Sequence, residues 1–165
     1  MDKELLKSSK HYLTFTLADE QFALGVSSVK EILDFINITQ VPQMPDFMLG
    51  VINLRGNVVP IIDLRLKLGM PATEKTVYTC IVFAEIAIND EFLDIGMLVD
   101  SVQEVIELEE NNIQDAPRIG MKIEKHFIDC LGKYRDSFLI ILNPRNILRE
   151  EDLDRINNQS KKVKK

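Results

Sequence analysis

The side chains of this chain that could carry out catalysis or bind a metal are few, and they lie far apart. The two histidines, His11 and His126, have no cysteine or carboxylate near them at the spacing of a metal site. The two cysteines, Cys80 and Cys130, lie outside any Cys-x-x-Cys pair and outside any motif of a catalytic nucleophile. No glycine-rich phosphate loop is present. We therefore expect no catalytic residues, no metal, no cofactor and no enzymatic activity.

An arginine at the tip of a predicted hairpin is the side chain best suited to bind a partner. Two apolar stretches, 51–54 and 58–62, flank the turn-like Arg55-Gly56-Asn57. β-branched residues favour extended backbone, and glycine supplies the positive φ that tight turns need, so Gly56 and Gly50 are predicted to be structural. The guanidinium of Arg55 can bind a carboxylate or backbone oxygens of another molecule. The alternative is that it only keeps the hairpin soluble.

Short alternating apolar stretches, separated by turn residues, run through most of the chain. Leu13-x-Phe15-x-Leu17 is one example of a half-buried strand. Many such strands indicate an all-β barrel or sandwich. Short helices are predicted at 63–68 and after Asn143-Pro144 near the C-terminus. The range 107–124 is predicted to be a loop of low regularity.

A helical turn is predicted over 29–33. Ser28 and Glu31 have the spacing of a capping box, which marks the start of many helices. In a helix, Val29 and Ile32 would lie on the same side, because residues three apart are neighbours on its surface.

Bulk properties limit the class of protein. A chain of 165 residues, 45% of them hydrophobic, suits one domain or two small joined lobes. Its net charge is −6, and it is −10 without the four lysines of residues 161–165, which disfavours nucleic acid as a partner. The chain shows neither a signal peptide nor the run of about 20 apolar residues that a membrane-spanning helix needs. We therefore expect a cytoplasmic protein with both cysteines free.

Four segments carry a resemblance to a known family. They are Tyr12–Phe22, the V-x-E-I element Val29–Ile32, the N-L-R-G hairpin and the G-x-x-V-D-x-V pattern within 95–102. In this order and spacing they resemble the CheW family, the coupling proteins of bacterial chemotaxis, over nearly the whole chain. The resemblance implies two intertwined five-stranded SH3-like barrels with a groove between them, and short helices including a C-terminal helix. It implies one CheW-like domain over residues 10–156, with flexible tails at 1–9 and 157–165.

The resemblance also implies a function. The chain would be a non-enzymatic scaffold that couples methyl-accepting chemotaxis receptors to the histidine kinase CheA. It would lie at the inner face of the membrane, in receptor arrays, and associate with the membrane only through receptors. By resemblance, Val29, Glu31, Arg55 and Val105 would line the receptor-binding groove, while no residues are assigned to the kinase contact. For Val29 and Val105, packing in the core is the alternative role.

Two alternatives to this function stay open at the level of sequence. The chain could be a CheW-like module from a larger CheV- or CheA-type protein. It could also be a small β-barrel protein that binds a ligand.

Overall fold

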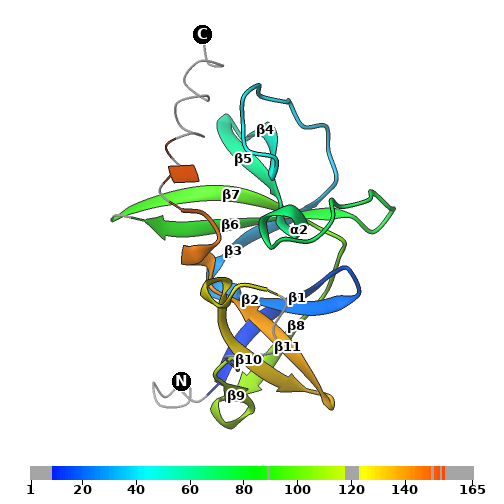
Figure 1. Ribbon diagram of the computed structural model, residues 1–165, viewed down its shortest axis with the longest axis vertical. Helices are drawn as coiled ribbons and strands as arrows, with labels where there is room; N and C mark the ends of the chain where they lie inside the picture. The colour runs from blue at the N-terminus through cyan, green and yellow to red at the C-terminus, as the bar shows by residue number, and fades with distance from the viewer. Residues whose placement is uncertain (1–8, 89, 118–122, 150, 153, 155–165) are drawn as a thin grey trace.

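The chain folds into two β-sheets that lie one above the other along the long axis of the molecule (Figure 1). This computed structural model describes residues 9–88, 90–117, 123–149, 151, 152 and 154. One sheet has the strand order β8-β1-β2-β11-β10-β9 and the other has the order β3-β6-β7-β5-β4. We name them the terminal lobe and the inserted lobe, because the first uses strands from both ends of the chain and the second uses the stretch between them.

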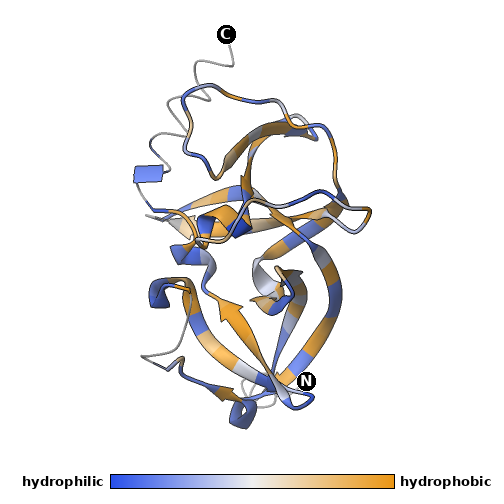
Figure 2. Cartoon of the chain, turned by 45° about the vertical axis from the view of Figure 1, so that its right-hand side comes forward, coloured by the Kyte–Doolittle hydropathy of each residue, from blue (hydrophilic) through white to orange (hydrophobic). Residues whose placement is uncertain are grey.

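The strands are short, as the turn spacing predicts. Those of the terminal lobe are β1 (Ser9–Leu17), β2 (Glu20–Gly25), β8 (Ser101–Glu109), β9 (Ile113–Gln114), β10 (Ile128–Tyr134) and β11 (Ser137–Leu142). Those of the inserted lobe are β3 (Val29–Asp34), β4 (Met48–Leu54), β5 (Asn57–Asp63), β6 (Cys80–Ile88) and β7 (Glu91–Val99). The terminal lobe thus has a sixth strand, β9, which is only two residues long. Apolar and polar residues alternate along many strands (Figure 2), the pattern of a sheet with one buried face.

Each sheet curls so that its edges approach. In the inserted lobe, the segment after β3 returns to the far edge of the sheet, where Thr39 and Val51 exchange two backbone hydrogen bonds of 2.9 Å. In the terminal lobe, a Cβ added to Gly132 of β10 would lie 2.5 Å from Leu108 of β8, although three strands separate β8 from β10 in the sheet order. Each lobe also has its own buried apolar cluster. These features confirm the expected pair of SH3-like barrels.

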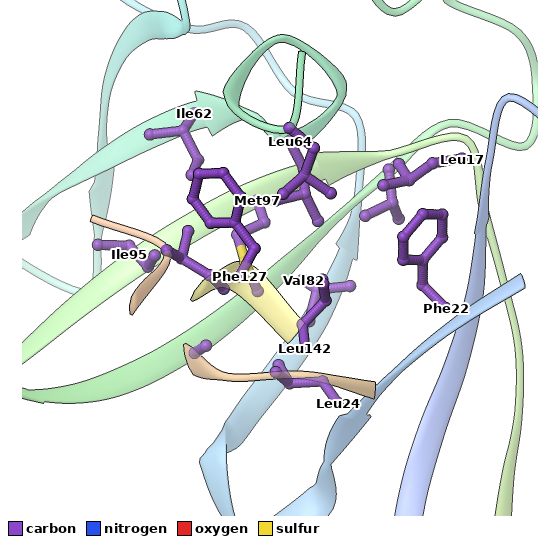
Figure 3. Close-up of a cluster of buried hydrophobic side chains, with 14 of the residues drawn as sticks. Leu17, Phe22, Leu24, Ile62, Leu64, Val82, Ile95, Met97, Phe127 and Leu142 are labelled. Carbon is purple, nitrogen blue, oxygen red and sulfur yellow. The ribbon is translucent and has the colours of Figure 1, made fainter. Parts of the chain in front are cut away.

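A third and larger apolar cluster joins the lobes (Figure 3). Its side chains come from both lobes, among them Leu17, Phe22, Leu24, Phe127, Leu142, Ile62, Leu64, Val82, Ile95 and Met97. Because apolar burial is the main favourable term in folding, this shared core fixes the lobes as one unit. The groove expected between the barrels stays a prediction, since this cluster fills their central contact.

A polar contact lies where the chain passes from the inserted to the terminal lobe. Asp100 lies between β7 and β8, and its carboxylate accepts hydrogen bonds from the guanidinium of Arg65. The same carboxylate accepts the backbone N–H of Ala18, in the β1–β2 turn, at 2.8 Å. This one side chain therefore ties parts of both lobes together.

The predicted helical turn over 29–33 is wrong. A 3₁₀ turn, η1 (Val26–Ser28), precedes a strand there, and β3 pairs antiparallel with β6. Val29 packs partly buried against the central cluster, whereas Ile32 is 40% exposed. The ladder pairs Val29 with Ala84 and Ile32 with Val82, so the two side chains share a face because of a register shift in the strand and not because of a helix. Pairing with a strand about fifty residues away, which no local capping signal can report, decides this segment.

One further expectation is modified and another is confirmed. The range 107–124 is more regular than predicted, because β8 continues through Glu109 and is followed by η2 (Glu110–Asn112) and β9. Residues 118–122 lie outside the described part. The predicted helix at 63–68 is confirmed as α2 (Leu64–Lys67), where the Asp63 side chain accepts the N–H of Arg65.

The C-terminal region is described only in part. After Asn143, whose side chain caps the 3₁₀ helix η4 (Pro144–Asn146), residues 151, 152 and 154 are helical. Leu153 and Ile156, which give the predicted C-terminal helix its apolar stripe, lie outside the described residues, as does nearly all of the tails proposed at 1–9 and 157–165. The limits of the domain therefore stay predictions.

Candidate partner-binding site

The β4–β5 hairpin presents Arg55 to solvent, as the sequence predicts. Arg55 and Gly56 are the two turn residues, with φ of 51° and 86°. Positive φ at both central positions is the mark of a type I′ turn, whose twist matches that of the flanking strands. The Oδ1 atom of Asn53 accepts the N–H of Gly56 at 2.9 Å and so closes the turn.

Arg55 forms a two-point ion pair with Glu31 of β3. Its Nη1 atom lies 3.1 Å from Oε1 and its Nη2 atom 2.8 Å from Oε2 of that carboxylate. The Arg55 side chain is 75% exposed and that of Glu31 is 20% exposed. A pair this exposed contributes little to stability, about 1 kcal/mol or less. Its main effect is therefore to hold the guanidinium in one orientation at the surface.

A second group of charges lies next to this pair. Lys30 Nζ lies 3.0 Å from Asp94 Oδ2 and 3.4 Å from Glu85 Oε2. The hydrogen bond to Asp94 raises the pKa of Lys30 above its usual value. The ladder between β3 and β6 shifts register between Val29 and Glu31, and a bulge of this kind changes the direction of neighbouring side chains. Adjacent residues of β3 thus serve two separate ion pairs.

The two ion pairs border a cavity of about 190 Å³. Its lining combines charged groups with apolar side chains and consists of Lys30, Glu31, Leu54, Arg55, Asn57, Val59, Phe83 and Asp94. An apolar surface bordered by oriented charges suits an amphipathic protein segment, which buries carbon atoms and pairs its own charges at the rim. Sequence reasoning missed Lys30, Phe83 and Asp94, because they come from three different strands.

The other residues of the expected site occupy different places. Val29 lies on β3 beside the charged residues, but its side chain packs partly buried against the central cluster. Val105 lies on β8, in the terminal lobe, and is 55% exposed. Gly50 adopts φ of 148° where β4 passes the Thr39 segment, and a Cβ there would clash with the backbone oxygen of Thr39. The structure therefore brings Glu31 and Arg55 together and places Val105 in the other lobe.

The cysteines have the environment of inert side chains. Both are buried, and burial raises the pKa of Cys80 above its usual value and that of Cys130 to about 11. A thiol that stays protonated at neutral pH is a poor nucleophile and a poor metal ligand. Within the described residues, no three His, Cys, Asp or Glu side chains converge as a metal site would require. In the same part of the chain, no helix has the length and apolar character to span a membrane.

Fold and site together define a class: a small protein of two joined β-barrels whose candidate site is an exposed, charge-bordered surface for another protein. Residues 11–152 match the family model of the CheW-like domain. The chain belongs to the CheW family of chemotaxis scaffold proteins.

Individual relatives agree. The chain is 31% identical to the chemotaxis protein CheW of Klebsiella aerogenes over 92% of its own length and 89% of that protein. It is 33% identical to the chemotaxis protein CheW of Bacillus subtilis over 88% of its length and 91% of that protein. The crystal structure of the scaffolding protein TtCheW from Thermoanaerobacter tengcongensis superimposes with a TM-score of 0.78 and 31% identity, covering 87% of this chain and 94% of that one.

Proposed function

We propose that this chain is a non-enzymatic scaffold that couples methyl-accepting chemotaxis receptors to the histidine kinase CheA. It acts in the cytoplasm, at the inner face of the membrane, and is held there by its receptors. Family membership and the relatives named chemotaxis protein CheW support this role over that of a small ligand-binding barrel. The same names favour it over a module of a CheV- or CheA-type protein. Holding two partners together raises their effective concentration, so each interface can be modest.

The observation that carries the proposal is the orientation of Arg55. Glu31 holds the guanidinium at the surface, beside the cavity with apolar walls. Two of the five N–H donors of Arg55 are used by Glu31, and the remaining ones are held in a fixed orientation for a receptor carboxylate, which reduces the entropy lost on binding. Glu31 is therefore a positioning residue for Arg55, and it also keeps the unoccupied site electrically balanced.

Two valines complete the proposed receptor surface. Val29 precedes the charged residues on β3, and Val105 offers an exposed apolar side chain on β8. A role in the receptor surface predicts that Val29→Glu abolishes receptor binding at little cost in stability, whereas the packing of Val29 against the central cluster predicts that the same change destabilises the protein. If this variant unfolds instead, Val29 belongs to the core and not to the site.

The test is co-sedimentation with receptor-containing membranes, with and without CheA, combined with measurement of CheA autophosphorylation. Arg55→Ala should fold normally, because its ion pair contributes little, but should bind receptors roughly tenfold more weakly, which corresponds to about 1.4 kcal/mol. Arg145→Ala is the matched control, because Arg145 is also exposed but lies on η4. Equal coupling by Arg55→Ala and the wild type would contradict the role of Arg55. Failure of the wild type to join receptor and kinase would reject the function.

A further inference from the structure

The two lobes repeat one arrangement of strands. Hairpin β10–β11 of the terminal lobe corresponds to hairpin β4–β5 of the inserted lobe, and both ladders shift register between the first and third residues of the first strand. The second strand of each hairpin then pairs parallel with another strand, β2 in one lobe and β7 in the other. After each hairpin, a polar side chain, Asp63 or Asn143, accepts the N–H two residues further on. Tyr134 at the end of β10 therefore takes the place of Leu54 at the end of β4.

Strand β8 corresponds to β3 in the same way. The sequence S-V-K-E at 28–31 is repeated as S-V-Q-E at 101–104. The ladder of β3 shifts register immediately before Glu31, and β8 has a bulge opposite Thr14 of β1 that involves Glu104. Because the two ladders share this irregularity, Glu104 has in the terminal lobe the position that Glu31 has in the inserted lobe.

The cavity beside Arg55 has a counterpart in the terminal lobe, with a volume of about 340 Å³. Both cavities are lined by the glutamate of the bulged strand and by the arginine of the hairpin turn, Glu31 with Arg55 and Glu104 with Arg135. The chain thus places one combination of charges in two equivalent settings.

The glutamate and the arginine pair with each other in only one of these settings. In the inserted lobe, Glu31 and Arg55 form the two-point ion pair. In the terminal lobe, the guanidinium of Arg135 lies 5.0 Å from the centre of the Tyr134 ring, and Oε1 of Glu104 lies 3.4 Å from the hydroxyl of the same tyrosine. Among the described residues, no ion pair joins Glu104 to Arg135.

The backbone of the turns does not account for this difference. Arg55 and Gly56 have φ of 51° and 86°, and Arg135 and Asp136 have φ of 48° and 61°. Both arginines are therefore the first residue of a two-residue turn in which both φ values are positive, so their side chains leave the backbone in similar directions.

The residue before the arginine does account for it. The face of the Tyr134 ring attracts the guanidinium of Arg135, and its hydroxyl approaches the carboxylate of Glu104. Tyr134 thus contacts both charges that would otherwise pair. Leu54 offers neither a ring nor a hydroxyl, so Arg55 has the carboxylate of Glu31 as its partner.

We propose that Leu54 is a positioning residue of the candidate receptor site, because it leaves Arg55 free to pair with Glu31 and thereby sets the orientation of the guanidinium. A tyrosine at this position would stack on Arg55, and a receptor carboxylate would first have to draw the guanidinium off the ring. This inference rests on the proposed function, in which Arg55 binds the receptor.

The first test is the Leu54→Tyr variant of the full-length protein in co-sedimentation with receptor-containing membranes. Binding should be weaker than that of the wild type by roughly fivefold, the factor that corresponds to an exposed cation–π contact. Arg55→Ala, expected to weaken binding roughly tenfold by itself, should weaken it no more than about twofold in the Leu54→Tyr background, because the guanidinium is already withdrawn. A tyrosine that only obstructed the cavity would leave the two effects independent, and the full tenfold loss would then reject the proposal.

Two further variants complete this test. Leu54→Met keeps an apolar side chain of similar volume without a ring and should restore the binding that Leu54→Tyr loses. Val58→Tyr is the matched control, because it adds the same side chain at an exposed residue of the same hairpin that does not line the cavity. It should bind receptors like the wild type.

The second test is structural and needs no receptor. In a crystal structure of Leu54→Tyr, the guanidinium of Arg55 should lie over the new ring and no longer bond to Glu31. In the converse variant, Tyr134→Leu, Arg135 should pair with Glu104. Gly56→Asp introduces the other difference between the two turns and should keep the pair of Arg55 with Glu31. If Leu54→Tyr does not fold, Tyr134→Leu decides the question.

The outcomes separate this inference from the proposed function. If the wild type binds receptors and Leu54→Tyr binds them as well as Leu54→Met does, the role of Leu54 is rejected and the proposed function stands. If Arg55 keeps its pair with Glu31 in Leu54→Tyr, or loses it in Gly56→Asp, the role of Leu54 is rejected as well. If the wild type fails to bind receptor-containing membranes, the proposed function is rejected, and the role of Leu54 in receptor binding is rejected with it.

Discussion

Replacing Gly50 with alanine should destabilise the protein far more than the same change at Gly56. Both glycines have positive φ and both belong to the β4–β5 hairpin. They differ in the space around them. A Cβ on Gly50 would lie 2.1 Å from the backbone oxygen of Thr39, whereas nothing lies within 4 Å of a Cβ on Gly56.

The magnitudes follow from these contacts. At Gly56 only the backbone preference is lost, about 1–2 kcal/mol. At Gly50 the φ of 148° lies in a region that is essentially restricted to glycine, which costs of order 1–3 kcal/mol. The clash must also displace Thr39, which exchanges two hydrogen bonds with Val51, each contributing about 1 kcal/mol. We therefore expect a loss of roughly 3–5 kcal/mol for Gly50→Ala.

Urea and thermal denaturation of the two variants and the wild type provide the assay. For a chain of this size, 1 kcal/mol shifts the midpoint by about 2–4 °C. Gly56→Ala should therefore lower the melting temperature by a few degrees, and Gly50→Ala by roughly 10 °C or more. The reasoning would be refuted if the Gly50→Ala variant were as stable as the Gly56→Ala variant, because the close approach of the Thr39 segment would then contribute nothing to the free energy of unfolding.

Three further predictions concern the rest of the molecule. Asp100→Ala should lower the free energy of unfolding, measured in urea, by about 2–3 kcal/mol, because it leaves the half-buried Arg65 without its carboxylate. The double variant Asp100→Ala/Arg65→Ala should be only slightly less stable than Asp100→Ala alone. Cys130, with its pKa raised to about 11 by burial, should react with a thiol reagent at pH 8 far more slowly in the native protein than in urea, and equal rates would disprove its burial. Burial also raises the pKa of Tyr12 to about 12, so between pH 10 and 12 the unfolded chain loses a proton that the folded protein keeps. Stability should therefore fall with rising pH in this window, and Tyr12→Phe should reduce the slope.

Local features of the fold could be predicted from the sequence because local chemistry determines them. The Arg55-Gly56 turn follows from a glycine between two β-branched stretches, and the Asp63 cap of α2 follows from a carboxylate before an apolar turn. Long-range pairing could not be predicted in this way. The segment 29–33 carries a capping-box spacing, yet it forms a strand because β6 offers it a partner. The alternation of Ile106 and Leu108 with glutamates was the signal that β8 extends past residue 106.

In the candidate site too, the sequence indicates individual residues but not the contacts between distant strands. Glu31 and Arg55 were named from the family resemblance, but nothing in the sequence indicated that they form an ion pair with each other. Lys30 and Asp94 were missed, because a contact between residues 64 positions apart depends on the order of the strands. The sequence also does not predict the bulge of β8 opposite Thr14, because a single threonine in an alternating stretch looks like any outward-facing strand residue.

The insertion of one lobe into the other has a consequence for how the protein is made. Strands β3–β7 are complete once residue 99 has left the ribosome, whereas β1 and β2 must wait for β8–β11 before their sheet can form. During synthesis, the inserted lobe can therefore fold while the β1–β2 hairpin still lacks β8 and β11, the strands that pair with its two outer edges. Those strands carry Phe15 and Phe22, both fully buried in the finished protein. The newly made chain thus exposes aggregation-prone strands until its last third emerges, and cellular chaperones have an evident point of action there.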